Sequence, residues 1–496
     1  MNLYLNKPEY YYEMENVCRL FFPHERFDKT GADSDSNSVT CTFETTNIGS
    51  LVHCCVCYND QRYETTESCP VTNDIREEEI SMARGLYSLF SNITGICPKW
   101  GILTGVRPGK LYSSIFKESN DQENTEAYMS RRLLVQADKL RLCRATYMAE
   151  QKALQHSTPD SFSLYISIPF CPTRCSYCSF VSHSVEKTKK MVPQYVDLLC
   201  EELKEVSRIA CEQNLILKTI YWGGGTPTQL SAEQLDRVMT VVEEVFDLSH
   251  LLEYTVEGGR PDTITPEKLL VLKNHGVDRL SINPQTMHNE ILRIIGRRHT
   301  AEQVLEAFQM ARDAGFDNIN MDVIAGLPGD TVEGFCSTLE QLLALNPENI
   351  TVHTLSIKRS SFLTERGEIA IVPNVDAVEQ MLDYASGVLL KNGYAPYYLY
   401  RQSKMLGNQE NVGWSKPGKD CLYNIFMMNE LHTVLSAGAG AVTRLKEPHG
   451  GQIERIFNYK YPYEYIERFD TLIERKKGIG EFYEKYKFEP PLLARG

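Results

Sequence analysis

The pattern of apolar residues changes near residue 160. Before that point it combines the spacing of helices with the spacing of strands. Helical spacing alternates there with two short strand-like runs that Asn47 and Gly49 separate, which predicts a β-hairpin. The predicted elements are helices at 8–22, 74–90 and 123–156 (one or two helices), strands at 38–44 and 51–58, and a turn at 100–111. We therefore expect an α+β domain over residues 1–157, whose role the sequence does not indicate.

From Phe162 onward, short apolar runs alternate with segments of helical periodicity. The predicted strands are 164–168, 218–222, 253–256, 279–283, 318–325 and 349–357. Strands joined through helices are parallel with right-handed crossovers. The pattern therefore predicts an α/β fold, a partial (β/α)6 barrel over residues 158–358. A doubly wound open sheet fits the same alternation, and both folds place chemistry at the carboxyl ends of their strands.

The remaining residues, 359–496, combine helical and strand patterns. The predicted elements are a helix at 376–391, an aromatic strand at 394–400, an apolar Gly/Ala-rich run at 429–440 and helices across 461–487. We expect a mixed α/β cap that covers the open side of the barrel and its substrate.

Composition narrows the class of protein without naming a function. The 496 residues carry a net charge of −13, which argues against a broad nucleic-acid surface. No apolar run approaches the roughly 20 residues that span a bilayer, and the first residues do not form a secretion signal. With 15 cysteines and no such signal, we expect a cytoplasmic protein whose cysteines are mostly reduced and buried.

Three cysteines stand on one loop after the first strand of the alternation. Cys171, Cys175 and Cys178 have the spacing C-x3-C-x2-C, and Pro169 and Pro172 prevent a helix there. Three thiolates can hold three irons of a [4Fe–4S] cluster and leave the fourth iron open to a ligand.

Two other interpretations of these three cysteines remain, half of a zinc site and buried thiols with no ligand. A zinc site has four ligands and paired spacing, and no paired Cys or His follows Cys178 within ten residues. A second metal site at Cys54, Cys55 and Cys57 is disfavoured because these residues lie within a predicted strand.

Other polar or glycine residues also stand at predicted strand ends. Gly223–Thr228, GGGTPT, allows close approach of the backbone to a ligand. Glu257 ends the third strand, where a loop carboxylate without function is an equal alternative. Asp322 lies inside the apolar fifth strand, where it needs either a ligand or a buried ion-pair partner.

Together these motifs resemble the radical S-adenosylmethionine (radical SAM) enzymes. The cysteine loop with Ile168–Phe170, Tyr177 and Ser179–Phe180, and the run YWGGGTPT, are similar to the oxygen-independent coproporphyrinogen III oxidases, or dehydrogenases. The resemblance covers about residues 160–445. The N-terminal region and the run NVGWSKPGKDCLYNI are most similar to the HemZ-type variant.

This resemblance implies a [4Fe–4S] cluster and S-adenosylmethionine (SAM) as cofactors. The residues implied for SAM are Tyr165, Tyr177, Ser179, Gly224, Gly225, Thr226, Glu257, Gln285, Arg297, Asp322 and Ser356, with Cys171, Cys175 and Cys178 as iron ligands. Tyr165 is the implied catalytic residue, packing near the cofactor. Glu257 is expected to accept from the SAM ammonium, Gln285 to bind the ribose and Arg297 to pair with a carboxylate. Ser356 is expected to contact adenine through its backbone.

The implied reaction converts propionates of coproporphyrinogen III into vinyl groups, giving protoporphyrinogen IX in haem biosynthesis. A radical derived from SAM removes a hydrogen from the propionate β-carbon, and carbon dioxide and one electron then leave. A flavodoxin or ferredoxin is the implied electron donor. The basic residues expected to bind propionates are Lys358, Arg359, Arg401, Lys416 and Arg444.

Two departures from the family pattern keep other functions open. Phe180 stands where the best-studied oxidases have a fourth cysteine, and Gly-Gly-Arg-Pro follows Glu257 in place of a short Asn/Asp-Pro sequence. One alternative is a haem chaperone, with His299 or His353 as axial ligand. The other is a radical SAM methyltransferase that degrades haem anaerobically.

Overall fold

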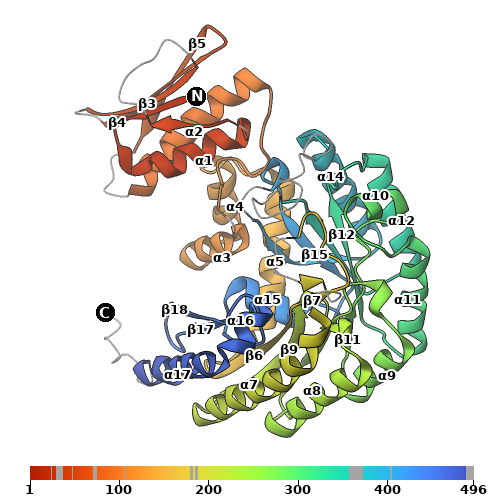
Figure 1. Cartoon of the computed structure of the whole chain (residues 1–496). Helices are drawn as coiled ribbons and strands as arrows, with labels where there is room; N and C mark the ends of the chain where they lie inside the picture. Colours follow the sequence, from red (N-terminus) through yellow and green to blue (C-terminus); the bar gives the residue numbers. More distant parts are fainter. Residues whose placement is uncertain are drawn as a thin grey trace. The chain divides into compact units, whose positions relative to one another are not determined.

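The computed structural model divides into two compact units, each drawn in Figure 1. The first contains residues 1–144 and 400–410, and the second contains 145–399 and 411–496. The residues described are 1–23, 25–29, 37–46, 49–70, 75–105, 107–178, 183–184, 188–356, 373–402 and 405–486. The three domain ranges expected from the sequence stay predictions.

The first unit is built on a five-stranded sheet with the order β2-β1-β3-β4-β5. Its strands are β1 (Asn2–Leu5), β2 (Asp28–Lys29), β3 (Ser38–Thr46), β4 (Gly49–Tyr58) and β5 (Gln61–Cys69). Its helices are α1 (Tyr11–Phe21), α2 (Ile75–Thr94), α3 (Pro108–Ser119), α4 (Gln122–Arg131) and the first part of α5 (Ala137–Leu154). The β3–β4 pairing confirms the predicted hairpin.

Two features of this unit differ from expectation. Helix α3 begins inside the predicted turn, because Pro108 at the first helical position has the fixed φ that a helix needs. The segment 400–410 joins the unit through a buried ion pair between Lys139 Nζ and Glu410 Oε1 at 2.6 Å. Trp100 Nε1 also donates to Glu410, at 2.7 Å.

The second unit contains an eleven-stranded sheet with the order β14-β15-β13-β12-β11-β10-β9-β6-β16-β17-β18. Its six central strands are parallel: β6 (Ser161–Ile168), β9 (Ile216–Gly224), β10 (Glu253–Glu257), β11 (Arg279–Ser281), β12 (Ile319–Ala325) and β13 (Asn349–Thr354). These strands follow the order of the chain without reversal, whereas a doubly wound sheet reverses. The partial barrel is confirmed. It is open because β6 and β13 pair with other strands and not with each other.

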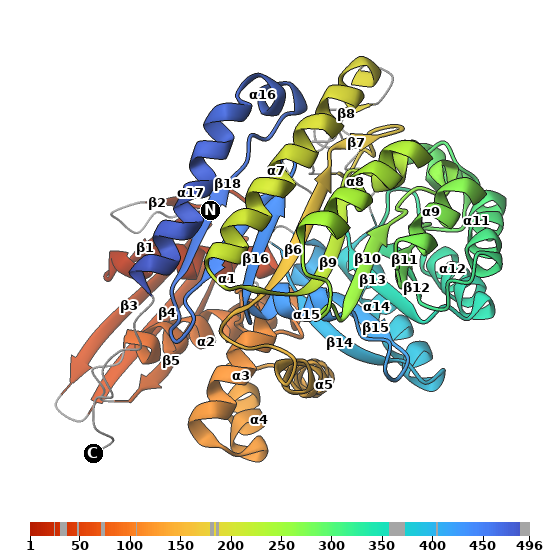
Figure 2. The ribbon, with the colours of Figure 1, turned by 90° about the horizontal axis from the view of Figure 1, so that it is seen from below.

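Helices connect the parallel strands and cover their outer side (Figure 2). They are α7 (Val192–Glu212), α8 (Ala232–Val245), α9 (Pro266–Asn274), α10 (Asn289–Ile294), α11 (Ala301–Asp313) and α12 (Val332–Leu345). Ser231 and Thr300 begin α8 and α11 with capping boxes, which set the helix starts directly after the strand-end loops.

The C-terminal region extends the sheet at both edges. Strands β14 (Ala395–Tyr400) and β15 (Asn411–Ser415) add beyond β13, while β16 (Thr433–Ala437), β17 (Val442–Lys446) and β18 (Ile453–Phe457) add beyond β6. The helices here are α14 (Val375–Lys391), α15 (Leu422–Asn429), α16 (Pro462–Glu467) and α17 (Phe469–Lys485). Much of the region expected as a cap therefore continues the same sheet.

A fully buried carboxylate fixes the last helices to α7. Glu202 accepts hydrogen bonds from Tyr465 Oη at 2.7 Å, Asn458 Nδ2 at 2.7 Å and the Gly438 amide at 2.8 Å. Lys476 Nζ lies 2.9 Å from the same carboxylate, and neither side chain has exposed surface. A buried carboxylate is tolerated here because its hydrogen-bonding capacity is filled.

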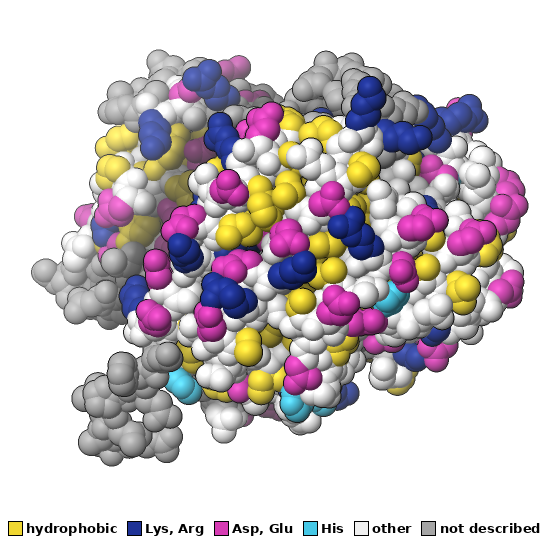
Figure 3. All heavy atoms as spheres, turned by 60° about the horizontal axis from the view of Figure 1, so that its bottom comes forward, with side chains coloured by type: hydrophobic (Ala, Val, Ile, Leu, Met, Phe, Trp, Pro, Cys, Tyr) yellow, Lys and Arg dark blue, Asp and Glu magenta, His cyan; other side chains and the backbone are white. Residues whose placement is uncertain are grey.

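The surface has no marked segregation of charge on the face seen in Figure 3. Acidic, basic and apolar side chains are interspersed across this face. Among the described helices, none combines the length and apolar character that crossing a bilayer requires.

Candidate functional site

The cysteine loop leaves the carboxyl end of β6 through the short strand β7 (Phe170–Cys171), and its described residues up to 178 contain no helix, as the prolines predict. Cys175 is buried, while Cys171 and Cys178 are half-buried. The backbone turns tightly, since the Cys178 amide donates to the Cys175 carbonyl at 3.1 Å. The Ser176 amide donates to the Ile295 carbonyl at 3.0 Å, which ties the loop to the segment after α10.

Arg260 ties the same loop to the end of β10. Its side chain is 3% exposed. Nη1 donates to the Thr173 carbonyl at 3.3 Å, both Nη atoms donate to Thr173 Oγ1 at 3.1 Å, and Nη1 is 3.9 Å from Cys175 Sγ. The Gly-Gly-Arg-Pro departure from the family pattern therefore delivers a cation to the cysteine loop. Sequence reasoning missed this residue. The available signal was an arginine flanked by glycine and proline directly after a strand end.

The electrostatics of the loop favour a thiolate at Cys175. Burial alone raises the pKa of its thiol, but the guanidinium groups of Arg297 and Arg260 lower it, and the net shift of the pKa is downward. Thiolate is the form that binds iron.

The glycine loop packs directly against the cysteine loop. A β-carbon on Gly225 would stand 2.7 Å from the Phe170 carbonyl oxygen and 3.0 Å from Cys171 Sγ, so no other residue fits without movement. Gly224 has φ +101°, which also favours glycine. Thr226 donates from its amide to the Phe170 carbonyl at 2.8 Å and from Oγ1 to Cys171 Sγ at 3.4 Å.

A stack of tyrosines lies inside the barrel below these loops. Tyr221 and Tyr423 have ring centroids 4.4 Å apart, and Tyr165 is 6.2 Å from each of them. Tyr221 Oη donates to Glu257 Oε1 at 2.5 Å. Burial raises the pKa of Glu257 to about 7, and the charge of Asp322 adds to this rise against the opposing effects of Tyr221 and His353. Tyr423 comes from α15 and was not anticipated from the sequence.

Asp322 has partners within the protein. Its Oδ1 accepts from Asn320 Nδ2 at 2.8 Å, and its Oδ2 lies 3.5 Å from His353 Nε2. Although burial opposes it, these contacts hold the pKa of Asp322 below its usual value. The carboxylate is therefore ionised, and it is the partner of the His353 side chain.

Gln285 and Arg297 present buried hydrogen-bonding atoms that the described residues leave unpaired. Gln285 adopts φ +69° and is held by its backbone, its amide donating to the Asp322 carbonyl at 2.9 Å. Its Oε1 has no partner, and neither has Arg297 Nε. Arg297 Nη1 donates to the Asn283 carbonyl at 2.6 Å, while Nη2 donates to Tyr177 Oη at 3.3 Å. Strain and unmade hydrogen bonds of this kind are typical of a ligand site.

For the other predicted site residues the structure gives a position or burial at most. Ser356 follows β13 and is half-buried. Ser179 and Phe180, and the propionate candidates Lys358 and Arg359, lie outside the described residues.

The remaining propionate candidates, Lys416, Arg401 and Arg444, lie in different surroundings. Lys416 Nζ donates to Asn346 Oδ1 at 2.6 Å, at the end of the barrel where strands begin, so its expected role is wrong. Arg401 belongs to the first unit, where Nη1 donates to the Leu103 carbonyl at 2.9 Å. Arg444, on β17, lowers the pKa of Tyr423 against its burial and so lies near the tyrosine stack.

The two histidines considered as axial haem ligands, His299 and His353, do not support that role. His299 has no exposed side-chain surface, and burial together with Arg297 and Arg260 lowers its pKa to about 3. His353 is occupied by Asp322, as described above.

The donor set fits a [4Fe–4S] cluster better than a single ion. Over the described part of the chain, no three His, Cys, Asp or Glu residues are arranged to hold one metal ion. A cluster does not require such a group, because each thiolate binds a different iron. The lowered pKa of Cys175 and the unpaired atoms of Gln285 and Arg297 fit a cluster with an adjacent polar ligand.

Comparison with known proteins agrees with this geometry. The profile of the Radical SAM superfamily matches residues 165–342. The chain is 40% identical over 396 residues to the oxygen-independent coproporphyrinogen-III oxidase-like protein HemZ of Bacillus subtilis, covering 79% of each chain. It is 34% identical over 282 residues to the heme chaperone HemW of Lactococcus lactis, covering 56% of this chain and 68% of that protein.

The fold also has a solved counterpart. The coproporphyrinogen III oxidase HemN of Escherichia coli superposes with a TM-score of 0.52 at 24% identity, over 66% of this chain and 72% of that one. Radical SAM proteins use a [4Fe–4S] cluster and SAM, which confirms the predicted cofactors. The chain thus belongs to the radical SAM superfamily, within the group that includes the coproporphyrinogen-III oxidase-like protein HemZ and the HemW chaperones.

Proposed function

We propose that this protein is an oxygen-independent coproporphyrinogen III dehydrogenase, which converts two propionate side chains into vinyl groups and yields protoporphyrinogen IX. The observation that carries the proposal is the meeting, at one end of the barrel, of the cysteine loop with unpaired buried atoms of Gln285 and Arg297. The similarity to HemZ over 79% of the chain supports the choice of substrate.

In this proposal Cys171, Cys175 and Cys178 hold the cluster. The glycines at 224 and 225 let the second loop lie against the first, and Thr226 donates to the Cys171 sulfur. When bound, the cluster and SAM supply a carbon radical that can take a hydrogen atom from an unactivated C–H bond.

The polar residues around the tyrosine stack then hold SAM. Glu257, when ionised, accepts from the SAM ammonium, and Arg297 Nε donates to its carboxylate. Gln285 Oε1 and the ionised Asp322 accept from the ribose hydroxyls. The roles of Tyr165, Tyr177, Ser179 and Ser356 in SAM binding belong to the same proposal.

The tyrosines form an aromatic wall on which a porphyrinogen can lie and from which water is excluded. Arg444, whose charge acts on Tyr423, pairs with a propionate in this proposal. For each propionate, one hydrogen atom passes from the β-carbon to the SAM-derived carbon radical, which becomes 5′-deoxyadenosine. The carbon–carboxylate bond then breaks to release carbon dioxide, and one electron passes to a separate one-electron acceptor as the vinyl group forms. A flavodoxin or ferredoxin supplies the electron that starts each cycle.

The test is one strictly anaerobic reaction of reconstituted protein, SAM, a strong reductant and coproporphyrinogen III, followed by mass spectrometry. We expect 5′-deoxyadenosine to rise together with mono- and bis-decarboxylated porphyrinogens. Cys175→Ala should abolish both products, whereas Cys336→Ala, a half-buried cysteine on α12, should not. Deoxyadenosine formed without any change in the tetrapyrrole would refute the substrate.

The similarity to HemW favours one second candidate, a haem-handling protein that uses the same cofactors. This function predicts stoichiometric binding of haem without decarboxylation. Haem titration followed by absorbance, alongside the reaction above, separates the two functions.

A further inference from the structure

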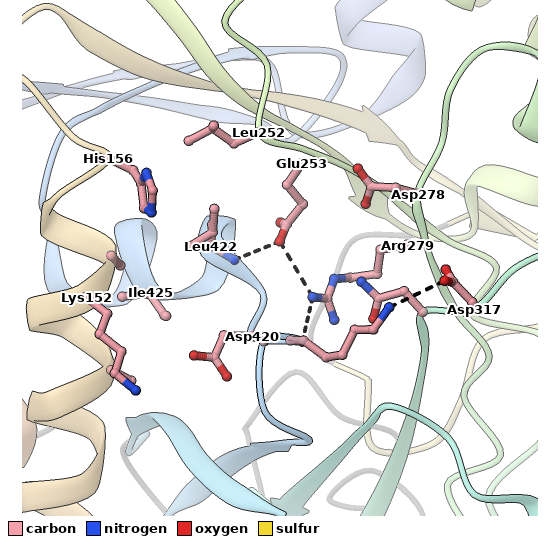
Figure 4. Close-up of a pocket in the computed structure, with 15 residues that line it drawn as sticks. Lys152, His156, Leu252, Glu253, Asp278, Arg279, Asp317, Asp420, Leu422 and Ile425 are labelled. Carbon is pink, nitrogen blue, oxygen red and sulfur yellow. Dashed lines mark hydrogen bonds and ion pairs between the residues drawn. The ribbon is translucent and has the colours of Figure 1, made fainter.

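The second unit has a cavity of about 410 Å³ at the end of the barrel where the strands begin (Figure 4). Glu253 and Arg279 are the first residues of β10 and β11, and Asn318 directly precedes β12. Helix α5 and the segment 418–425 complete the lining. The strands run from this cavity toward the cysteine loop, so the cavity is separate from the candidate active site.

Arg279 is the central residue of the cavity, and much of its hydrogen-bonding capacity is unused. Its side chain is 3% exposed. Nη2 donates to the Lys419 carbonyl at 2.8 Å and lies 3.7 Å from Glu253 Oε2. Nε and Nη1 have no hydrogen-bond partner among the described residues. Leaving buried donors unmade costs about 1–3 kcal/mol each, more for a charged group.

The nearby carboxylate does not fill these donors because it is occupied elsewhere. Glu253 accepts from the Leu422 amide at 2.8 Å, the Tyr423 amide at 3.2 Å and Cys421 Sγ at 3.2 Å. These contacts hold Glu253 at the start of α15. The free donors of Arg279 are therefore available to an anionic group entering the cavity.

The cavity is also lined by carboxylate groups, which would repel a simple anion. Lys419 Nζ pairs with Asp317 at 3.6 Å, and Asp278 lies close enough to Arg279 and Lys273 for their charges to act on its carboxylate. Asp420 has no ion-pair partner among the described residues, and it lines the cavity together with Lys152 and Arg279. Asp278 accepts from the Tyr254 amide at 3.0 Å, and Asp420 accepts from Ser415 Oγ. Figure 4 shows Lys152 and Asp420 projecting toward the same space from opposite sides.

We propose that this cavity binds a small zwitterion of the amino-acid class, with its carboxylate on Arg279 and Lys152 and its ammonium on Asp420. A ligand with both charges matches the unpaired groups of both signs, while an anion or a cation alone matches only half of them. The volume is at the lower end of the roughly 300–1,000 Å³ typical of ligand sites, which suits a molecule of this size. This ligand is distinct from the substrate and the cofactors proposed above.

The test is a thermal-shift screen of the cluster-free full chain against each of the 20 amino acids at 10 mM. Each hit is then titrated calorimetrically beside its own deaminated and decarboxylated analogues. We expect at least one amino acid to bind and both single-charge analogues to bind at least tenfold more weakly. If no amino acid shifts the melting temperature, or if an analogue binds as well as its parent, the proposal is overturned and the polar groups are satisfied by water.

Variants locate the binding. Asp420→Asn and Lys152→Gln should each weaken the hit about tenfold, and Lys391→Gln, an exposed lysine on α14, should leave it unchanged. Arg279→Gln should abolish binding, and the first two variants carry the test if this one does not fold. Because the SAM site can also accept an amino acid, Asp322→Ala is the second control. If binding is lost in Asp322→Ala and retained in Asp420→Asn and Lys152→Gln, the ligand occupies the SAM site and the proposal fails.

Discussion

Removing the guanidinium of Arg260 should loosen the cluster without unfolding the protein. In Arg260→Gln, Thr173 loses donors that now lie 3.1–3.3 Å from its carbonyl and hydroxyl oxygens. Hydrogen bonds to a charged group contribute about 1.5–3 kcal/mol each. Because Thr173 is half-buried, water replaces some of the lost hydrogen bonds. We therefore take the free energy of a single hydrogen bond as the net loss. That loss raises the population of an opened loop by roughly 10- to 150-fold, at about 1.4 kcal/mol per factor of ten.

The assay is the rate at which a chelator removes iron from anaerobically reconstituted protein. When loop opening precedes iron loss, the first-order rate should rise by roughly 10- to 150-fold in Arg260→Gln, by the same arithmetic. Arg260→Lys should recover part of the loss, because lysine restores the charge but not the forked geometry. Arg293→Gln, an exposed arginine on α10, is the matched control.

The reasoning is refuted by iron release at the wild-type rate in Arg260→Gln. A higher rate accompanied by an equally large fall in the melting temperature of the cluster-free protein would also refute it. Arg260 would then stabilise the fold in general and not the loop.

Further outcomes are expected at four residues. Cys175→Ala should remove the brown colour and all SAM cleavage, and full retention of iron would overturn its assignment as a ligand. Asp322→Ala should keep the cluster and weaken SAM binding; unchanged SAM affinity in a destabilised protein would make the aspartate purely structural. Because the pKa of Glu257 is raised to about 7, SAM affinity should rise roughly tenfold from pH 6 to pH 8 as the carboxyl ionises, and this dependence should vanish in Glu257→Gln. The same raised pKa makes ionisation of Glu257 destabilising, so its contribution to stability is lost as the pH rises through 7. Glu202→Ala should lower the free energy of unfolding in urea by about 3–5 kcal/mol, because it leaves Lys476 buried and uncompensated, and a loss below 1 kcal/mol would contradict this.

The six strands and their helices were predictable because each element is specified by its own residues. A partial barrel and a doubly wound sheet share this alternation, and the observed strand order without reversal distinguishes the two. The cysteine loop was predictable for the same reason, since Pro169 and Pro172 act locally.

Contacts between distant segments were not predictable in this way. Lys416 looked like a propionate ligand because its charge is visible in the sequence, while its position at the opposite end of the barrel depends on pairing between β13 and β15. Arg260 received no role from the sequence because its partner, Thr173, lies 87 residues earlier. Tyr423 needs α15 to enter the barrel before it can meet Tyr221. The periodicity of apolar residues predicts that a helix forms there but not where the helix packs.

The partners of Glu202 are synthesised long after Glu202 itself. Tyr465, one of its partners, lies 263 residues later in the chain, and ribosomes add about 5–20 residues per second. Roughly 15–50 s therefore separate the synthesis of α7 from that of its clamp. Throughout this interval the nascent chain already holds the cysteine loop, while β16 is absent from the edge of β6 for most of it. A buried carboxylate without its partners is unfavourable, so α7 stays hydrated until the clamp arrives. Closure of this edge consequently comes late in synthesis, well after the cysteine loop has been made.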